Sequence, residues 1–153
     1  MKIGVISDTH GFLDPRVEII FSGVQHILHA GDIGEAMIEL ELKAIAPVTV
    51  VLGNTDLGLP YRLTEIFATA EKKFLVQHIV NPVSPDEKLQ ARLMRDKPDA
   101  VIFGHTHKKY AETIGDILFF NPGYAGKFRP GSERSVAILH VEDGQIRYDF
   151  IPL

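Results

Sequence analysis

Two histidines separated by one residue follow a short apolar run in the second half of the chain. Ala100–Phe103 is apolar, Gly104 ends the run, and His105 and His107 come next. The run predicts a buried strand, and a glycine without a Cβ lets the backbone turn sharply after it. Residues i and i+2 of an extended loop point the same way, so both imidazoles can face one ion such as Zn, Mn, Fe or Ni. Taken alone, the motif is also compatible with a polar loop that carries two histidines by chance.

Residues of the same chemical kind follow other predicted strands. Three earlier apolar segments predict strands, at Lys2–Ser7, Val24–Ala30 and Val48–Leu52. A carboxylate, imidazole or amide follows each of them, namely Asp8 and His10, Asp32, and Asn54. In open α/β sheets, ligands bind beyond the carboxyl ends of the strands. The repetition therefore predicts that these side chains gather at one edge of a sheet.

Helices are predicted between these strands, and they must position the strand ends. The first starts with Asp14 as the expected N-cap and Pro15 at the first helical position, and the second covers about Glu35–Ile45 at helical spacing. A third has Ser84 as the expected N-cap, with Glu87 completing a capping box, and runs to about Lys97. Between the last two helices, a strand pair is expected at Arg62–Thr69 and Lys72–Gln77, joined by a turn near Ala70 and Glu71 and followed by His78.

The pattern changes after His107. Four short strands are predicted, at Tyr110–Ile114, Ile117–Phe120, Ser135–Val141 and Gln145–Ile151. Gly115-Asp116 and Asp143-Gly144 are typical hairpin turns, so this half is expected to form an antiparallel meander. A long loop rich in glycine and proline, residues 121–131, lies between the hairpins, and such loops are usually functional or mobile.

Length and composition indicate an ordinary globular protein. The 153 residues predict one domain, 1–153, and the hydrophobic share of 45% and charged share of 24% are unexceptional. A net charge of -4 does not suggest a nucleic-acid groove, and no apolar run approaches the length of a membrane span. The absence of cysteine excludes disulfides and thiolate ligands. With no signal-peptide pattern after Met1, a cytoplasmic location is expected.

Each candidate ligand also has a simpler explanation. Asp8 and Asp32 could be helix N-caps, Asn54 a turn residue, and His78 a hydrogen-bonded histidine at a sheet edge. The ordered set is more informative than its members. In chain order it comprises Asp8, His10, Asp32, Asn54, His78, His105 and His107. Two carboxylates, one amide and four imidazoles are a poor match for calcium and a good match for two transition-metal ions.

The ordered motifs resemble a known family. They are Asp8-x-His10, Gly31-Asp32, Gly53-Asn54-x-Asp56, a lone His78, and Gly104-His105-x-His107. Together they resemble the signature of the calcineurin-like metallophosphoesterases, with spacing closest to the small prokaryotic phosphodiesterase branch. The resemblance implies an α/β fold, a four-layer α/β/β/α sandwich of two mixed sheets flanked by helices, with a dinuclear metal centre.

The resemblance also implies a role for each residue of the set. Asp8, His10 and His107 would hold the first metal, and Asn54, His78 and His105 the second. Asp32 would bridge the two ions, and Asp32 and Asn54 would be the catalytic residues. Manganese is the expected ion, with Ni, Fe or Zn as alternatives. The implied activity is hydrolysis of a small phosphodiester by a hydroxide that two metals activate.

Two other functions remain open, a phosphomonoesterase and an interaction scaffold like a retromer subunit of the same superfamily. Self-association is expected by analogy only. Among the basic residues, Arg129 in the long loop is the best candidate for a substrate contact. The other basic candidates are Lys108, Lys109, Lys127 and Arg134, for each of which a solvated surface position is the simpler reading. Tyr124 could line a substrate pocket.

The chain departs from the family pattern at two places. Ile79-Val80-Asn81 follows His78, where relatives usually have a glycine, so the loop over the second metal could differ. Thr55 follows Asn54, where many members have a histidine that can donate a proton to the leaving group. The histidines outside the set, His26, His29 and His140, are expected to have no ligand role. For His29, support of a ligand residue or a packing role is the most that is expected.

Overall fold

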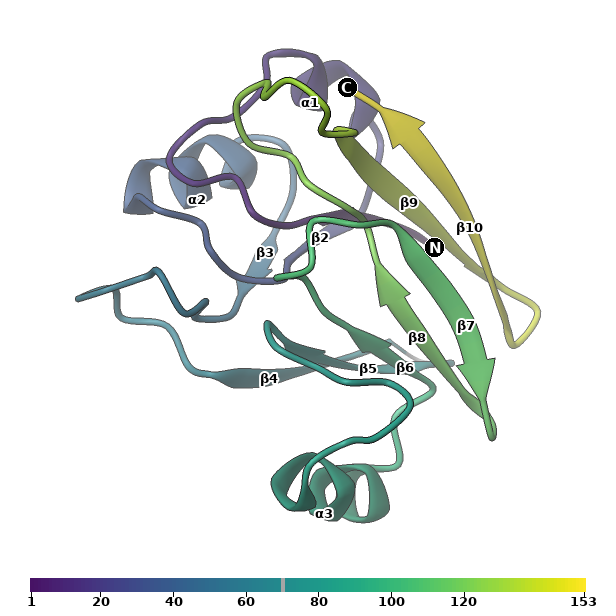
Figure 1. The fold of residues 1–153 in the computed structure, drawn as a ribbon. Coiled ribbons are helices and arrows are strands. Elements are labelled where there is room, and N and C mark those ends of the chain that lie inside the picture. The colour runs from purple at the N-terminus through teal and green to yellow at the C-terminus, as the bar shows by residue number, and fades with distance from the viewer. Residues whose placement is uncertain (70) are drawn as a thin grey trace.

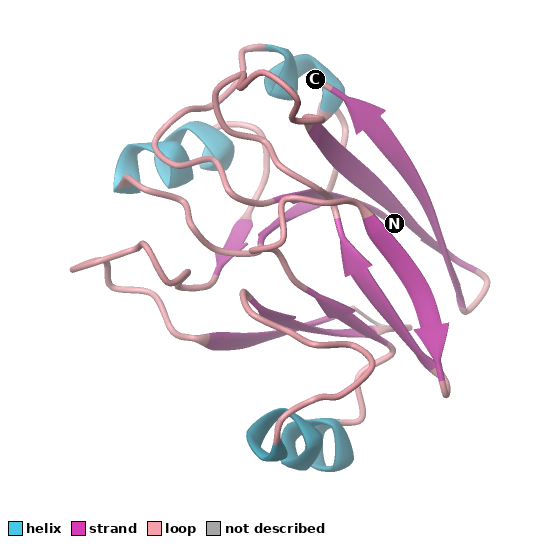
Figure 2. Ribbon diagram, in the orientation of Figure 1, coloured by secondary structure: helices cyan, strands magenta, loops and turns pink. Residues whose placement is uncertain are grey.

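Two five-stranded sheets pack face to face, with helices on their outer faces (Figures 1 and 2). The computed structural model describes residues 1–69 and 71–153. In spatial order, the first sheet contains β10 (Gln145–Pro152), β9 (Ser135–Glu142), β1 (Lys2–Ile6), β2 (His26–His29) and β3 (Val48–Val50). The second contains β4 (Thr64–Ala68), β5 (Lys73–Gln77), β6 (Ala100–Ile102), β8 (Ile117–Asn121) and β7 (Tyr110–Ile114). The helices are α1 (Arg16–Ile20), α2 (Ala36–Lys43) and α3 (Glu87–Asp96).

Both sheets are mixed, as the predicted four-layer sandwich requires. In the first sheet β1, β2 and β3 are parallel, and β9 runs antiparallel to both β1 and β10. In the second sheet β5, β6 and β8 are parallel, and the edge strands β4 and β7 are antiparallel to their neighbours. The prediction of an α/β/β/α architecture is therefore confirmed.

Three apolar clusters fill the interfaces between the four layers. Alternate residues of β1 explain how one strand serves two of them: Ile3 and Val5 face the second sheet, whereas Ile6 packs in the cluster beneath α1 and α2. A third cluster, which includes Leu89, lies between the second sheet and α3. Gly4 lies under Phe21 of the α1 region, and a Cβ there would come within 3.0 Å of the aromatic ring.

The predicted antiparallel meander is wrong. The β7–β8 and β9–β10 hairpins do form, but β8 joins the second sheet beside β6, and β9 joins the first sheet beside β1. Turn residues specify local pairing only, and each hairpin completes a sheet begun earlier in the chain. The long loop after β8 therefore crosses from one sheet to the other (Figure 1).

The helix boundaries differ from the prediction at two starts. Asp86 is the N-cap of α3, with its carboxylate accepting a hydrogen bond from the Leu89 N–H at 2.8 Å, so the expected cap at Ser84 is wrong by two residues. At α1 the cap is Pro15, although the Asp14 carboxylate accepts from the Arg16 N–H at 3.0 Å. The turn predicted around Ala70 involves a residue outside those described. Among the described residues, no helix has the length and apolar character needed to cross a membrane.

Candidate metal centre

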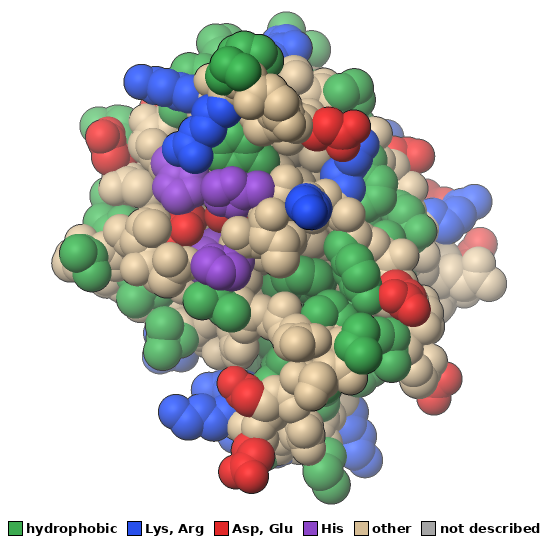
Figure 3. Space-filling view, in the orientation of Figure 1, with side chains coloured by type: hydrophobic (Ala, Val, Ile, Leu, Met, Phe, Trp, Pro, Cys, Tyr) green, Lys and Arg blue, Asp and Glu red, His purple; other side chains and the backbone are tan. Residues whose placement is uncertain are grey.

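The seven candidate ligands meet at one edge of the sandwich. They follow five strands, three in the first sheet and two in the second. Asp8 and His10 follow β1, Asp32 follows β2, and Asn54 follows β3. From the second sheet, His78 follows β5, and the loop after β6 carries His105 and His107. Figure 3 shows the result on the molecular surface, where histidine side chains surround acidic groups on one face. The structure therefore brings together all seven side chains that the sequence grouped as candidate metal ligands.

The backbone at this edge is unusual. Five of the seven candidate ligands have positive φ angles: Asp8 (56°), His10 (47°), Asp32 (52°), His105 (69°) and His107 (59°). A non-glycine residue in this region costs on the order of 1 kcal/mol or more, and such strain concentrates at functional sites. Elsewhere in the described chain, non-glycine residues adopt positive φ only at Lys97, which ends α3, and at Asp143 in the β9–β10 turn.

Close approaches between the loops explain two of the glycines. A Cβ at Gly104 would collide with the Ser7 hydroxyl, and a Cβ at Gly53 would collide with Asp32. The loops are also tied together by hydrogen bonds, since the Gly104 N–H donates to the His78 carbonyl at 3.0 Å and the His105 N–H donates to the Asp8 carboxylate at 3.1 Å. Glycine is therefore required where the ligand-bearing loops touch.

Asp8, His10 and His107 form the first group of converging ligand atoms. Asp8 Oδ1 lies 3.2 Å from His107 Nε2 and 3.9 Å from His10 Nε2. Asp8 is buried, and within the described chain both Asp8 Oδ1 and His10 Nε2 lack a hydrogen-bond partner. Burial acts to raise the pKa of the Asp8 carboxyl, but His107 and Ser7 outweigh it, so that pKa lies below its usual value. The Asp8 carboxylate in turn raises the pKa of His107.

Asn54, His78 and His105 form the second group. Asn54 Oδ1 is 3.1 Å from His78 Nε2 and 3.0 Å from His105 Nδ1. His78 Nδ1 lies 2.7 Å from the Ala30 carbonyl, which can only accept, so this nitrogen carries the proton and Nε2 presents a lone pair. His78 Nε2 also lies 3.2 Å from Asp32 Oδ2. Lone pairs on an amide oxygen, a carboxylate oxygen and an imidazole nitrogen therefore converge, and a cation would satisfy all three.

Asp32 lies between the two groups. Its Oδ2 is 3.2 Å from His78 Nε2 on one side and 3.8 Å from His10 Nε2 on the other, while its Oδ1 accepts from the Thr55 N–H at 2.9 Å. Asp8 Oδ1 also lies 3.9 Å from His78 Nε2, so Asp8, Asp32 and His78 form a further set within metal-binding reach of one another. The first group offers a carboxylate and two imidazoles, the second offers an amide oxygen and two imidazoles, and the Asp32 carboxylate lies between them. Ligands of these kinds suit divalent metal ions.

Sequence reasoning missed two residues that hold this site in shape. The Asp56 carboxylate is 3% exposed and accepts hydrogen bonds from the N–H groups of Ile33, Gly34 and Gly53, at 3.1, 2.9 and 2.9 Å. It thereby joins the Asp32 loop to the Asn54 loop. Its place two residues after Asn54 was part of the recognised motif, but the sequence did not reveal the direction of the side chain.

The second residue is Asn121, at the end of β8 and completely buried. Its amide nitrogen donates to the Gly104 carbonyl at 2.9 Å and to the Thr106 hydroxyl at 3.1 Å. Its side-chain oxygen accepts from the Gly123 N–H. Asn121 therefore fixes the loop between His105 and His107 against the start of the long loop.

The long loop covers the first ligand group. Tyr124 is buried and stacks on His107, with ring centroids 4.7 Å apart and an interplanar angle of 23°. The Arg129 guanidinium lies over the Tyr124 ring, with its central carbon 5.4 Å from the ring centre. Tyr124 thus supports the candidate ligand His107. Arg129, from the same loop, lies next to Tyr124 and so close to the first ligand group.

Other basic candidates have structural partners. Arg134 is nearly buried and pairs with Asp14 at 2.9 Å, while its Nε donates to the Gly126 carbonyl. Lys109 pairs with Glu133 at 3.1 Å. These contacts tie the long loop to the body of the protein, which is a sufficient explanation for both cations.

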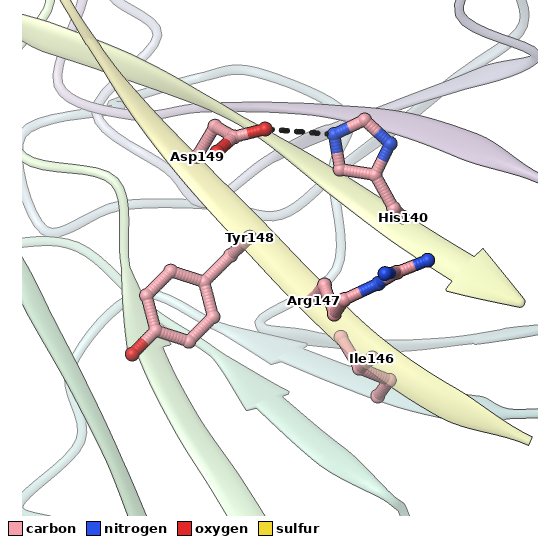
Figure 4. A pocket seen from close by; sticks show the side chains of 5 residues that line it. All are labelled: His140, Ile146, Arg147, Tyr148 and Asp149. Carbon is pink, nitrogen blue, oxygen red and sulfur yellow. Dashed lines mark hydrogen bonds and ion pairs between the residues drawn. The ribbon is translucent and has the colours of Figure 1, made fainter.

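The three histidines set aside on sequence grounds lie outside both groups. His29 is fully buried, with Nε2 2.9 Å from the Thr9 hydroxyl and Nδ1 accepting from the Gly31 N–H, and burial lowers its pKa to about 4. His26 stacks on Phe67. His140 pairs with Asp149 at 2.9 Å in a depression of about 570 Å³ on β9 and β10 (Figure 4), none of whose lining residues is a candidate ligand.

Comparison with known proteins agrees with this geometry. Residues 1–144 match the family model of the calcineurin-like phosphoesterase superfamily domain. The chain belongs to this superfamily. The resemblance recognised from the ordered motifs is therefore confirmed.

Several proteins are similar to this chain in sequence or in structure. A probable metallophosphoesterase of Methanocaldococcus jannaschii is 39% identical over 133 residues, which cover 80% of this chain and 67% of that protein. A phosphodiesterase of the same organism is 27% identical over an alignment of 163 positions including gaps, which spans 96% of this chain and 97% of that protein. Among solved structures, a Vps29 mutant from Entamoeba histolytica matches with a TM-score of 0.77 at 23% identity, covering 100% of this chain and 99% of that chain. At this identity the last match shows the fold alone.

Proposed function

We propose that this protein is a phosphodiesterase that uses two divalent metal ions. The observation that carries the proposal is the pair of ligand groups that share Asp32, with Asp8 Oδ1 and His10 Nε2 buried and without hydrogen bonds in the described chain. Burying a polar atom without a partner costs about 1–3 kcal/mol, so a site with two such atoms is stabilised by an ion. The phosphodiesterase named among the relatives supports the choice of reaction.

Each ligand group would hold one ion. The first would be bound by Asp8, His10 and His107, and the second by Asn54, His78 and His105, with Asp32 contacting both. Bound divalent ions supply Lewis-acid polarisation of a phosphoryl oxygen and lower the pKa of a water. Manganese remains the proposed ion, with Ni, Fe or Zn as alternatives, since oxygen and nitrogen ligands of this kind accept several divalent metals according to availability.

The protein's own groups set the charge and the orientation of the site. Asp8 and Asp32 are the two acidic side chains among the seven, and Asn54 supplies a neutral oxygen. Two divalent ions would therefore leave the centre positive, as binding of a phosphate requires. The hydrogen bond from His78 Nδ1 to the Ala30 carbonyl fixes the tautomer that presents Nε2 to the metal. Arg129, which is exposed and lies over the Tyr124 ring, would contact a phosphate oxygen from the rim of the site.

A direct assay tests this function. The protein is freed of metal, loaded with Mn²⁺ or Ni²⁺, and assayed with bis(4-nitrophenyl) phosphate and with 4-nitrophenyl phosphate. Metal-dependent turnover with a higher kcat/KM for the diester is expected, whereas a preference for the monoester would favour a phosphomonoesterase. His107→Ala should remove the activity, and His140→Ala, which changes a histidine outside the site, should retain it. No turnover together with negligible metal affinity would support the interaction scaffold instead.

A further inference from the structure

A cavity of about 410 Å³ opens directly beside the second ligand group. Asn54 and His78 form part of its wall, so a phosphoryl group held at the metal centre would have one of its ester arms next to this space. The volume lies within the range of about 300–1,000 Å³ that is typical of small-molecule sites. The remaining lining residues are Leu52, Gly53, Leu63, Thr64, Gln77, Ile79, Asp86, Lys88 and Arg92.

One wall of the cavity is apolar and exposed. Leu63 is 69% exposed and Ile79 is 51% exposed, and Leu52 lies beside them. The Gln77 amide donates to the Ile79 carbonyl at 3.0 Å, so the residue after His78 is held at the cavity edge. The replacement of the family's usual glycine by Ile79 therefore adds an apolar contact surface next to the candidate ligands. Water leaves such a surface favourably when an apolar group covers it.

Two cations from α3 line the same cavity. Neither Lys88 nor Arg92 forms an ion pair or a side-chain hydrogen bond with any residue of the described chain, whereas the neighbouring Arg95 pairs with Asp96. The one acidic lining residue, Asp86, uses a carboxylate oxygen to cap α3 through the Leu89 N–H. The lining thus carries two positive charges and one negative charge. This net positive charge favours an anionic group in the part of the cavity next to α3.

We propose that this cavity binds the second ester arm of the substrate, and that this arm is an aromatic or aliphatic group ending in an anion. The inference rests on the proposed phosphodiesterase function. The metal centre would take the phosphodiester, Leu63 and Ile79 would cover the apolar part of the arm, and Lys88 and Arg92 would receive its carboxylate or phosphate. The cavity would in this way distinguish such diesters from simple alkyl ones.

Matched ligands test the proposal by binding and by turnover. Dissociation constants are measured by calorimetry on the Mn²⁺-loaded protein for four non-hydrolysable methylphosphinates. Both arms of these ligands are attached through P–C bonds, and the second arm is methyl, phenyl, 4-carboxyphenyl or 4-phosphonophenyl. The kcat/KM is measured for 4-nitrophenyl diesters that carry the same four arms. Partial burial of a phenyl ring should tighten binding about tenfold over methyl. An anionic end should add about a threefold gain, and the two anionic arms show whether carboxylate or phosphate fits better.

Variants assign these gains to the two parts of the cavity. Arg92→Gln should reduce the preference for anionic arms over phenyl, and Arg95→Gln, the matched change on the same helix outside the cavity, should leave it unchanged. Leu63→Ser should reduce the preference for phenyl over methyl. Leu57→Ser, which changes an exposed leucine that does not line the cavity, should leave that preference unchanged.

The outcomes separate this inference from the proposed function. Arm-dependent affinity without any turnover would support the cavity assignment and refute the phosphodiesterase. Turnover with equal affinity and equal kcat/KM for all four arms would overturn the cavity assignment and leave the phosphodiesterase standing. Equal losses of preference in Arg92→Gln and Arg95→Gln would also overturn it, because the effect would then be one of overall charge.

Discussion

The Asp56 carboxylate is expected to be the main structural support of the metal centre. It lies between two ligand-bearing loops and accepts three backbone hydrogen bonds, two through Oδ2 from Ile33 and Gly53 and one through Oδ1 from Gly34. Asp56→Asn keeps the shape of the side chain but replaces one acceptor oxygen by an NH₂ group. That group would face a backbone N–H, so at least one of the bonds must break.

The size of the effect follows from these contacts. A hydrogen bond to a charged group contributes about 1.5–3 kcal/mol, and leaving a buried N–H unpaired has a similar cost. Loss of one or two of the bonds should lower the free energy of unfolding by about 2–4 kcal/mol. For a chain of this size, each kcal/mol corresponds to about 2–4 °C in Tm, so a fall of about 4–16 °C is expected.

Metal affinity should fall as well, because Ile33 directly follows Asp32 and Gly53 directly precedes Asn54. Residues that orient metal ligands typically contribute about 10–100-fold to affinity. Urea and thermal unfolding of the metal-free variant and calorimetric titration with Mn²⁺ give the two numbers. Asp116→Asn, the same chemical change at an exposed turn, is the control. A loss below about 0.5 kcal/mol, the range of ordinary surface substitutions, or an unchanged metal affinity would refute this role.

Three further outcomes follow from the structure. Asp32→Ala should remove both metals together, since its Oδ2 faces His10 on one side and His78 on the other, and retention of one full equivalent in elemental analysis would contradict the bridging role. Burial lowers the pKa of His29 from 6.5 to about 4, so between these values the unfolded chain binds a proton that the folded chain does not. Stability should therefore fall as pH decreases through this window, with His29 contributing about 2 kcal/mol between pH 7 and pH 5. His29→Gln should show a smaller pH dependence in urea unfolding of the metal-free protein, and an equal dependence would refute the assignment. Because the Thr55 hydroxyl is too weak an acid to protonate a leaving group, kcat/KM should fall steeply as leaving-group pKa rises in a series of aryl diesters, and Thr55→His should flatten the slope. A shallow slope in the unchanged protein would indicate another acid.

The positions of the candidate ligands were predictable because they depend on a local rule. Short apolar strands such as Ala100–Ile102 are recognisable from composition, and parallel strands carry the residues that follow them to one edge. Each of the seven residues lies directly after, or within a few positions of, a strand end. The residue types and their spacing after the predicted strands were therefore sufficient to group the seven side chains. This holds although the five strands that precede them belong to two different sheets.

Features that depend on contacts between distant loops were not predictable. The assignment of the β7–β8 and β9–β10 hairpins to separate sheets depends on which strands already occupy each sheet. Asp8 and Asp32 have positive φ angles where other loops approach them closely: the Asp8 N–H donates to the Gly31 carbonyl, and the Gly53 backbone lies against Asp32. The direction of Asp56 has the same origin, since its three donors come from two separate loops.

The effect of Ile79, where the chain departs from the family pattern, also depends on contacts that could not be predicted from the sequence. The family resemblance implied that a bulkier segment stands where relatives usually have a glycine, and it suggested a disturbed second metal site. In the structure His78 keeps its contacts with Asn54, Asp32 and the Ala30 carbonyl, while Ile79 turns to the cavity wall and Val80 is buried. The substitution changes the surroundings of the candidate site and leaves the candidate ligand in place.

A crystal structure of the manganese-loaded protein, with anomalous scattering recorded at the Mn edge, tests the central claim most directly. The account predicts two anomalous peaks at this sheet edge, with Asp32 in contact with both. One peak should be bound by Asp8, His10 and His107, and the other by Asn54, His78 and His105. No peak at this edge, or a single ion that does not contact Asp32, would contradict the dinuclear centre on which the proposed phosphodiesterase depends.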